Sequence, residues 1–160
     1  ALGAKCKGLI ALFTDININY TLENQMKLTF ATFLSVTSVF LFIDVIWLSQ
    51  SVGYFYQPNI GDLLREDIII FPAALFYFIY PLGVTILVVL PSLKKGSLKT
   101  ISLNGFVLGF VAYGTYNLTN MATLKGWSAS VVVVDMIWGG ILTGASAVLG
   151  THMTRKILKL

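Results

Sequence analysis

The sequence predicts an all-α integral membrane protein: a four-helix transmembrane bundle with both termini on the same, inner side. Three observations support this prediction. Hydrophobic residues make up 56% of the 160 positions, charged residues make up only 11%, and four apolar stretches alternate with short polar gaps. Soluble domains carry about 25% charged residues. A span needs about 20 apolar residues to cross the hydrocarbon, so four spans fill this chain.

The first two spans are expected over residues 28–52 and 68–90, where apolar residues dominate. Between them, residues 53–67 are interpreted as an outer loop, and the aromatic residues 54–56 can rest in the membrane interface. Pro81 falls in the middle of the second span, where proline removes a backbone hydrogen bond. We therefore expect a kink there.

The third and fourth spans are expected over residues 101–124 and 129–150. The turn between them is only a few residues long, so the two helices must be antiparallel neighbours. Each carries a pair of glycines spaced four residues apart, which favours close helix packing. These glycines are Gly105, Gly109, Gly140 and Gly144. We expect a tight inner seam and a more open outer half.

Residues 1–25 differ from the rest, because their one apolar patch is too short to span a bilayer and a polar stretch follows it. They also lack the apolar length and the small-residue cleavage site of a secretory signal. We interpret residues 1–25 as an N-terminal extension that lies in the membrane interface or contacts a partner. Residues 26–160 then form the transmembrane domain.

The formal net charge of +4 is distributed unevenly about the membrane. Arg65 and Lys125 are the basic residues on the outer side. The remaining nine fall on the other side, namely Lys5, Lys7, Lys27, Lys94, Lys95, Lys99, Arg155, Lys156 and Lys159. Basic loops face the cytoplasm or its organellar equivalent. We expect a bacterial or organellar inner membrane and, because topology already accounts for the charge, no nucleic-acid partner.

Two carboxylates lie inside predicted spans, each within the same tetrad Asp-x-Ile-Trp. The tetrads run from Asp44 to Trp47 and from Asp135 to Trp138. Helical rise places both acids about 10 Å below the outer edge. A three-residue spacing puts each indole on the same helix face as its own carboxylate. Ionisable groups at this depth are costly unless paired or hydrated, so we expect both to face inward.

The third span adds a polar stripe at helical spacing, formed by Tyr113, Tyr116, Asn117 and Asn120. Tyr77 of the second span falls slightly deeper. All four helices can therefore contribute to one polar layer. The predicted ligand-binding residues are Asp44, Asp135, Trp47, Trp138, Asn117, Asn120, Tyr116 and Tyr77.

This polar layer supports more than one interpretation. The residues can serve only as interhelical hydrogen bonds that fix the bundle. Alternatively, carboxylates beside indoles can bind a cation through charge and ring face, or two close carboxylates can share a proton. Cys6 and His152 stand alone, so neither a metal nor another cofactor is expected. Without a hydrolase, metalloenzyme or nucleotide motif, we expect no enzyme, although a lipid head-group enzyme using the paired acids is a third hypothesis.

Several segments together resemble the bacterial family of small membrane proteins named domain of unknown function 2177. They are residues 44–48, 55–56, 80–83 and, above all, the long segment 113–127 (YGTYNLTNMATLKGW), followed by Asp135 and Trp138. The resemblance covers residues 26–155 and implies four spans and no particular activity. Two departures are Pro81, where some relatives are expected to have a small residue, and residues 1–25, which lie outside the family pattern.

The leading functional hypothesis is a membrane protein that binds, and also moves, a small cation or polar solute in its outer-half pocket. The alternative is an accessory structural subunit of a larger bacterial or organellar complex, for example a respiratory or photosynthetic one. The N-terminal extension motivates this alternative. The expected partners are the lipid bilayer and either other membrane subunits or a second copy of the chain.

Overall fold

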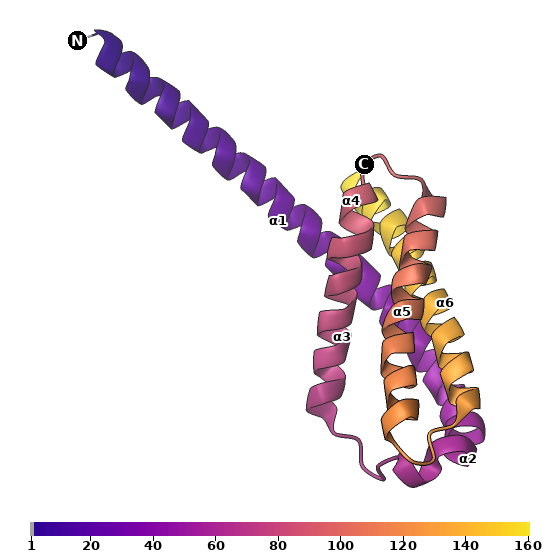
Figure 1. Ribbon diagram of the computed structural model, residues 1–160. Coiled ribbons are helices and arrows are strands. Elements are labelled where there is room, and N and C mark those ends of the chain that lie inside the picture. Colours follow the sequence, from indigo (N-terminus) through magenta and orange to yellow (C-terminus); the bar gives the residue numbers. More distant parts are fainter. Residues whose placement is uncertain (1) are drawn as a thin grey trace.

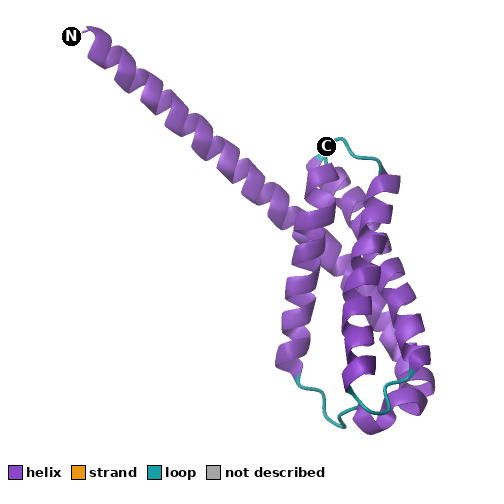
Figure 2. Cartoon of the chain, in the orientation of Figure 1, coloured by secondary structure: helices purple, strands orange, loops and turns teal. Residues whose placement is uncertain are grey.

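The chain folds into four long helices joined by short helical segments and loops (Figures 1 and 2). The computed structural model describes the backbone of residues 2–160 and the side chains of residues 22–160. In chain order the elements are α1 (Leu2–Ser51), the π-helix η1 (Val52–Tyr56), α2 (Gln57–Ile60), the 3-10 helix η2 (Gly61–Leu63), α3 (Ile70–Val84), the π-helix η3 (Thr85–Val89), α4 (Leu90–Ser92), α5 (Leu98–Thr123) and α6 (Ala129–Leu158).

The predicted all-α membrane fold is confirmed. Among the described residues, Leu22–Leu63, Ile70–Ser92 and Ala129–Leu158 are long and apolar enough to cross a bilayer. Helix α5 has 26 residues, also a sufficient length, but its Asn, Thr and Tyr side chains make it less apolar. It packs mainly against α6 and buries Asn117 there. Its exposed threonines, Thr115, Thr119 and Thr123, donate their hydroxyls to carbonyls of α5 itself.

The first helix begins well before the predicted span. Helix α1 passes without a break through the expected boundary at residue 26, and its 50 residues correspond to about 75 Å. Figure 1 shows its first half leading away from the bundle, at the end where the C-terminus lies. The role predicted for residues 1–25 remains a prediction, and their side chains lie outside the described residues.

At the C-terminal end of α1, the interpretation of residues 53–67 as a loop is wrong for residues 53–63. The backbone stays helical through η1, α2 and η2 to Leu63. Pro58 stands in the first turn of α2, where a missing N–H costs little. The wider π-helical turn precedes α2, and Figure 1 shows α2 lying across the ends of α5 and α6.

The predicted glycine seam between the third and fourth spans is confirmed. A Cβ added to Gly105 would lie 3.0 Å from the Cα of Gly144, and one added to Gly109 would overlap the carbonyl oxygen of Gly139. Backbone approaches backbone so closely here that α5 and α6 form the most extensive helix pair of the bundle.

The second span carries Pro81 inside α3, and the helix widens into the π-helical turn η3 four residues later. At the C-terminal end of α4, Arg155 of α6 donates from Nε to the Leu93 carbonyl at 2.8 Å and from Nη2 to the carbonyls of Ser92 and Gly96. A cation on these terminal carbonyls complements the helix dipole and fixes α4 to α6.

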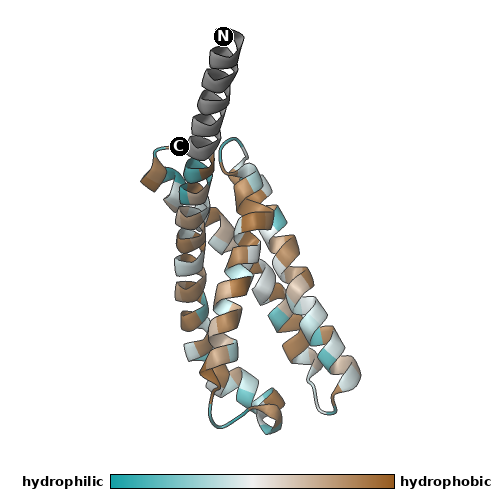
Figure 3. Cartoon of the chain, turned by 90° about the vertical axis from the view of Figure 1, so that its left-hand side faces the viewer, coloured by the Kyte–Doolittle hydropathy of each residue, from teal (hydrophilic) through white to brown (hydrophobic). Residues whose placement is uncertain are grey.

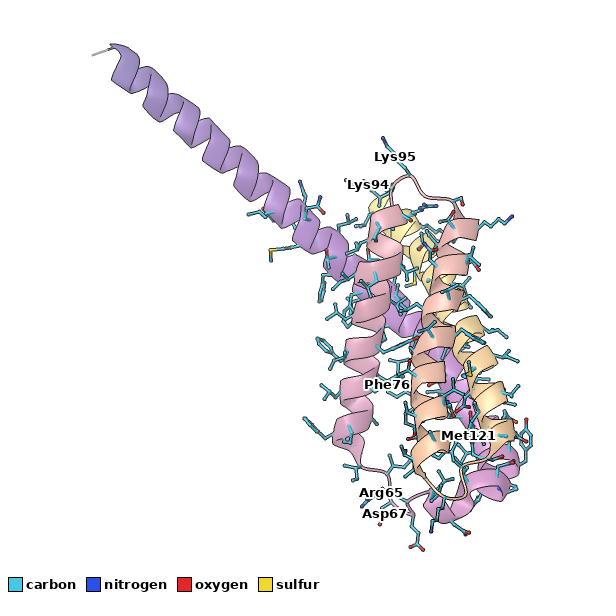
Figure 4. The ribbon with its side chains drawn as sticks, viewed as in Figure 1. Arg65, Asp67, Phe76, Lys94, Lys95 and Met121 are labelled. Atoms are coloured by element: carbon cyan, nitrogen blue, oxygen red, sulfur yellow. The ribbon has the colours of Figure 1, made fainter. Side chains whose placement is uncertain are left out.

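The outer surface of the helices is largely apolar, as expected for contact with lipid. Phe42, Ile70 and Phe71 are each at least 70% exposed, and Figure 3 shows hydrophobic residues along the helices. Figure 4 places Lys94 and Lys95 at one end of the bundle and Arg65 and Asp67 at the other. The chain therefore contacts the bilayer through its helices, with charged loops at both ends.

Candidate functional site

The two intramembrane carboxylates are buried inside the bundle and line one pocket. Asp44 on α1 is 5% exposed and Asp135 on α6 is 8% exposed. The pocket has a volume of about 210 Å³ and is lined by Asp44, Trp47, Leu48, Tyr56, Tyr113, Asp135 and Trp138. Helices α1, α5 and α6 and the η1 turn thus bring their polar groups to one place.

Asp44 accepts two hydrogen bonds from two other helices. The Tyr77 hydroxyl of α3 donates to Oδ2 at 2.8 Å, and the Trp138 Nε1–H of α6 donates to Oδ1 at 3.3 Å. Tyr77 and Trp138 were both predicted as site residues. The donors are neutral, so they satisfy the carboxylate oxygens without cancelling a negative charge.

Asp135 also accepts two hydrogen bonds. The Tyr56 hydroxyl donates to Oδ1 at 2.5 Å, and Nδ2 of Asn117 donates to Oδ2 at 3.2 Å. Asn117 is fully buried, and its own Oδ1 accepts from Nε1 of Trp127 at 3.3 Å. The amide therefore links the carboxylate to the outer turn between α5 and α6.

The two tryptophans of the tetrads stack on each other between these acids. The ring centroids of Trp47 and Trp138 are 4.2 Å apart and the rings are inclined by 16°. Trp138 donates to the aspartate of α1, whereas Trp47 donates at 3.2 Å to the Tyr56 hydroxyl, which in turn donates to Asp135. Each indole was expected beside the carboxylate of its own helix. The hydrogen bonds instead cross between helices, because α1 and α6 are antiparallel and their three-residue steps run in opposite directions.

Two of the predicted residues lie away from the carboxylates. Tyr116 is 58% exposed and meets Trp127 edge to face, with ring centroids 5.6 Å apart. Asn120 is half-buried, and within the described part of the chain its side chain makes no hydrogen bond to either aspartate. The stripe on α5 therefore splits, with Tyr113 and Asn117 facing inward and the other two displaced outward.

Sequence reasoning missed both Tyr56 and Trp127 as residues of the site. Tyr56 was placed in a loop; residues 55–56 belong to the family resemblance, but neither periodicity nor composition distinguishes Tyr56 from Tyr54 as a site residue. Its hydroxyl reaches Asp135 only because the chain remains helical past Trp47 and then turns across the bundle. Tyr80 was missed as well; its hydroxyl shares a 2.8 Å hydrogen bond with Thr143 below the pocket.

No basic side chain among residues 22–160 lies within 4.0 Å of either carboxylate. The same residues contain no group of three His, Cys, Asp or Glu side chains that could together hold a metal ion. The donor set of the pocket consists of two carboxylates, tyrosine hydroxyls, one amide and two indoles. Such a set can bind a cation through charge and ring faces, or can hold a proton on a carboxylate.

Comparison with known proteins agrees with the resemblance found in the tetrads and in the long α5 segment. No curated protein and no solved structure matches the chain. The model of one family, described as "Predicted membrane protein (DUF2177)", matches residues 29–152. That match covers most of the chain, including parts of all four long helices and every residue of the pocket, and the chain therefore belongs to this family.

Proposed function

We propose that the protein binds a small cation or polar solute in the pocket between Asp44 and Asp135, and that it moves this ligand through the bundle. One observation carries the proposal: two buried carboxylates line one pocket, and no basic side chain among residues 22–160 pairs with either. A buried charge without a counter-charge costs several kcal/mol, so the pocket needs a bound cation or a proton.

The groups around the carboxylates support a binding role over a purely structural one. Structural hydrogen bonds between helices need only one donor and one acceptor, whereas here four neutral donors are directed at two acids. The stacked indoles of Trp47 and Trp138 add aromatic surface beside both carboxylates. Under the proposal, the acids supply charge and the indoles supply ring faces to the ligand.

The test measures ligand binding and solute or proton uptake by the purified chain in liposomes. Asp44→Asn and Asp135→Asn keep the size of the side chain, remove its charge and replace one of its two acceptor oxygens by an amide donor. Asp62→Asn is the matched control, because Asp62 is an exposed acid in η2. We expect each buried substitution to abolish binding and flux, and the control to retain both. Unchanged binding and flux in both buried variants would refute the proposal.

A second candidate function is that of an accessory subunit in a larger membrane complex, and the shape of α1 favours it. The helix leads away from the bundle, and around the point of departure Leu22, Met26 and Phe30 are 55–71% exposed. Mass measurement of the native particle in mild detergent discriminates, since a particle that contains only this chain contradicts the subunit role. Two copies of the chain in one particle would point to a homodimer.

We place the protein in a bacterial or organellar inner membrane, with Lys94 and Lys95 on the inner side. The ordering of basic loops along the chain supports this orientation. The proposed activity is binding and transport rather than catalysis.

A further inference from the structure

A second cavity adjoins the site and opens on another face of the bundle. Its volume is about 380 Å³, and it is lined by Phe76 and Tyr80 of α3, by Ala112, Tyr113 and Tyr116 of α5, and by Asp135 of α6. It shares Tyr113 and Asp135 with the smaller pocket between the carboxylates. Asp135 is therefore accessible to ligands in either space.

The cavity opens laterally, between α3 and α5. Helix α3 packs mainly against α1, whereas the following turn η3 packs against α5 and α6. Within α3, Tyr80 reaches both of these helices, because its hydroxyl bonds Thr143 and its ring meets Tyr113 edge to face. Phe76 and Tyr116, which are 38% and 58% exposed, stand at the rim, while the buried Asp135 forms the base. Figure 4 labels Phe76 where the α3 and α5 ribbons run apart. Both helices lie within the membrane-spanning bundle, so this opening faces hydrocarbon.

The lining of the cavity selects among ligands. Four of its six residues carry aromatic rings and one is an alanine, so an apolar body gains free energy by entering it. A strongly hydrated solute would lose most of its water here, because only Asp135 and the hydroxyls of Tyr113 and Tyr116 could replace it, while the Tyr80 hydroxyl is already bonded to Thr143. The one charged group, Asp135, attracts cations and repels anions. Rings beside a carboxylate favour an organic ammonium head group.

We propose that the ligand of this site is an organic ammonium ion with an apolar body, which enters from the bilayer between α3 and α5. Its ammonium group binds Asp135, and its apolar body occupies the aromatic cavity against Phe76 and Tyr113. This inference rests on the proposed function, because it requires that Asp135 binds a cation. It adds the chemical class of the ligand and its route of entry.

Two probes test the inference, and they share a head group and differ in the apolar body. Binding of radiolabelled phenethylammonium and of methylammonium is measured on the full chain in lipid nanodiscs, with protein-free nanodiscs subtracted. Burial of the phenyl ring predicts that phenethylammonium binds at least about tenfold more tightly. Equal affinities, or binding of methylammonium alone, would overturn the assignment of ligand class and leave the proposed function standing.

Substitutions at two neighbouring positions of α5 separate the cavity from the carboxylate. Ala112→Trp fills the cavity, whereas Val111→Trp adds the same bulk at a side chain that is 57% exposed to lipid. We expect Ala112→Trp to weaken phenethylammonium binding about tenfold and methylammonium binding less than about twofold. Val111→Trp should change neither. If Ala112→Trp leaves phenethylammonium binding intact, the cavity does not hold the apolar body.

Asp135→Asn distinguishes a wrong assignment of the ligand class from the absence of a cation site. Loss of binding of both probes, together with the selective effect of Ala112→Trp, supports the whole proposal. If Asp135→Asn weakens both probes but Ala112→Trp weakens neither, only the aromatic cavity is excluded. If the wild-type chain binds neither probe, or if Asp135→Asn leaves both bound, the cation site itself is refuted.

Discussion

Replacing Tyr56 by phenylalanine tests the site through a residue that was not among the predicted ligand-binding residues. The substitution keeps the ring and removes a hydroxyl that donates to Asp135 at 2.5 Å and accepts from the Trp47 indole at 3.2 Å. Asp135 would keep Asn117 as its one remaining donor. The Trp47 N–H would lose its acceptor.

The expected magnitude depends on the charge of the acceptor. A hydrogen bond to a charged group contributes about 1.5–3 kcal/mol, and an orphaned buried donor costs about 1–3 kcal/mol more. Hydrogen bonds between neutral groups inside membranes average only about 0.6 kcal/mol. We therefore expect Tyr56→Phe to lower the free energy of unfolding by about 3 kcal/mol. Reversible unfolding of the purified chain in mixed micelles of increasing SDS content measures it.

Two further tyrosines serve as comparisons in the same assay. Tyr77→Phe removes one donor from Asp44 but orphans no indole, so its effect should be smaller, about 2 kcal/mol. Tyr54 is 71% exposed, and Tyr54→Phe should change stability by less than about 0.5 kcal/mol. If Tyr56→Phe is no more destabilising than Tyr54→Phe, the hydrogen-bond chain from Trp47 to Asp135 does not exist in the folded protein.

Two other substitutions probe the bundle outside the pocket, in the same unfolding assay. Gly109→Ala should lower the free energy of unfolding by about 1–3 kcal/mol, because the added methyl group overlaps the Gly139 carbonyl. Gly83→Ala places its methyl group in free space and should raise the free energy of unfolding by up to about 1 kcal/mol through helix propensity. Equal effects of the two would contradict the tight seam. Arg155→Met removes three hydrogen bonds to the carbonyls at the end of α4 and should cost about 1–2 kcal/mol, while Lys156→Met, at an exposed neighbour, should be nearly neutral. A neutral Arg155→Met would show that these bonds do not hold α4 to α6.

The fold was largely predictable because the bilayer imposes simple constraints on sequence. Apolar length located the helices, and the spacing of Gly105 and Gly109 located the seam where α5 meets α6. The end of the first helix was not predictable. Tyr54 and Tyr56 resemble interfacial residues equally well, and the outcome depends on how η1 directs α2 across the bundle.

The two charged residues of the candidate site were predicted, but most of the hydrogen bonds that connect its residues were not. Asp44 and Asp135 stood out because carboxylates are rare inside spans. Their hydrogen-bond partners depend on how neighbouring helices are rotated and shifted relative to one another. The periodicity of residues within one helix carries no information on this. For the same reason Asn117 and Asn120 looked equivalent on the α5 stripe, although only Asn117 reaches a carboxylate.

The hydrogen bonds of the two tetrad tryptophans cross between α1 and α6, so the position of one helix depends on the position of the other. Trp47 and Trp138 are stacked, and each is bonded toward the aspartate of the opposite helix. Sliding α1 and η1 past α6 by one helical turn, about 5.4 Å, would break the stack and the two bonds that cross the helices, Tyr56 to Asp135 and Trp138 to Asp44. The stacked tryptophans therefore hold α1 and α6 in one register. Any motion that separates the two helices at this level must break the contacts of both tryptophans together.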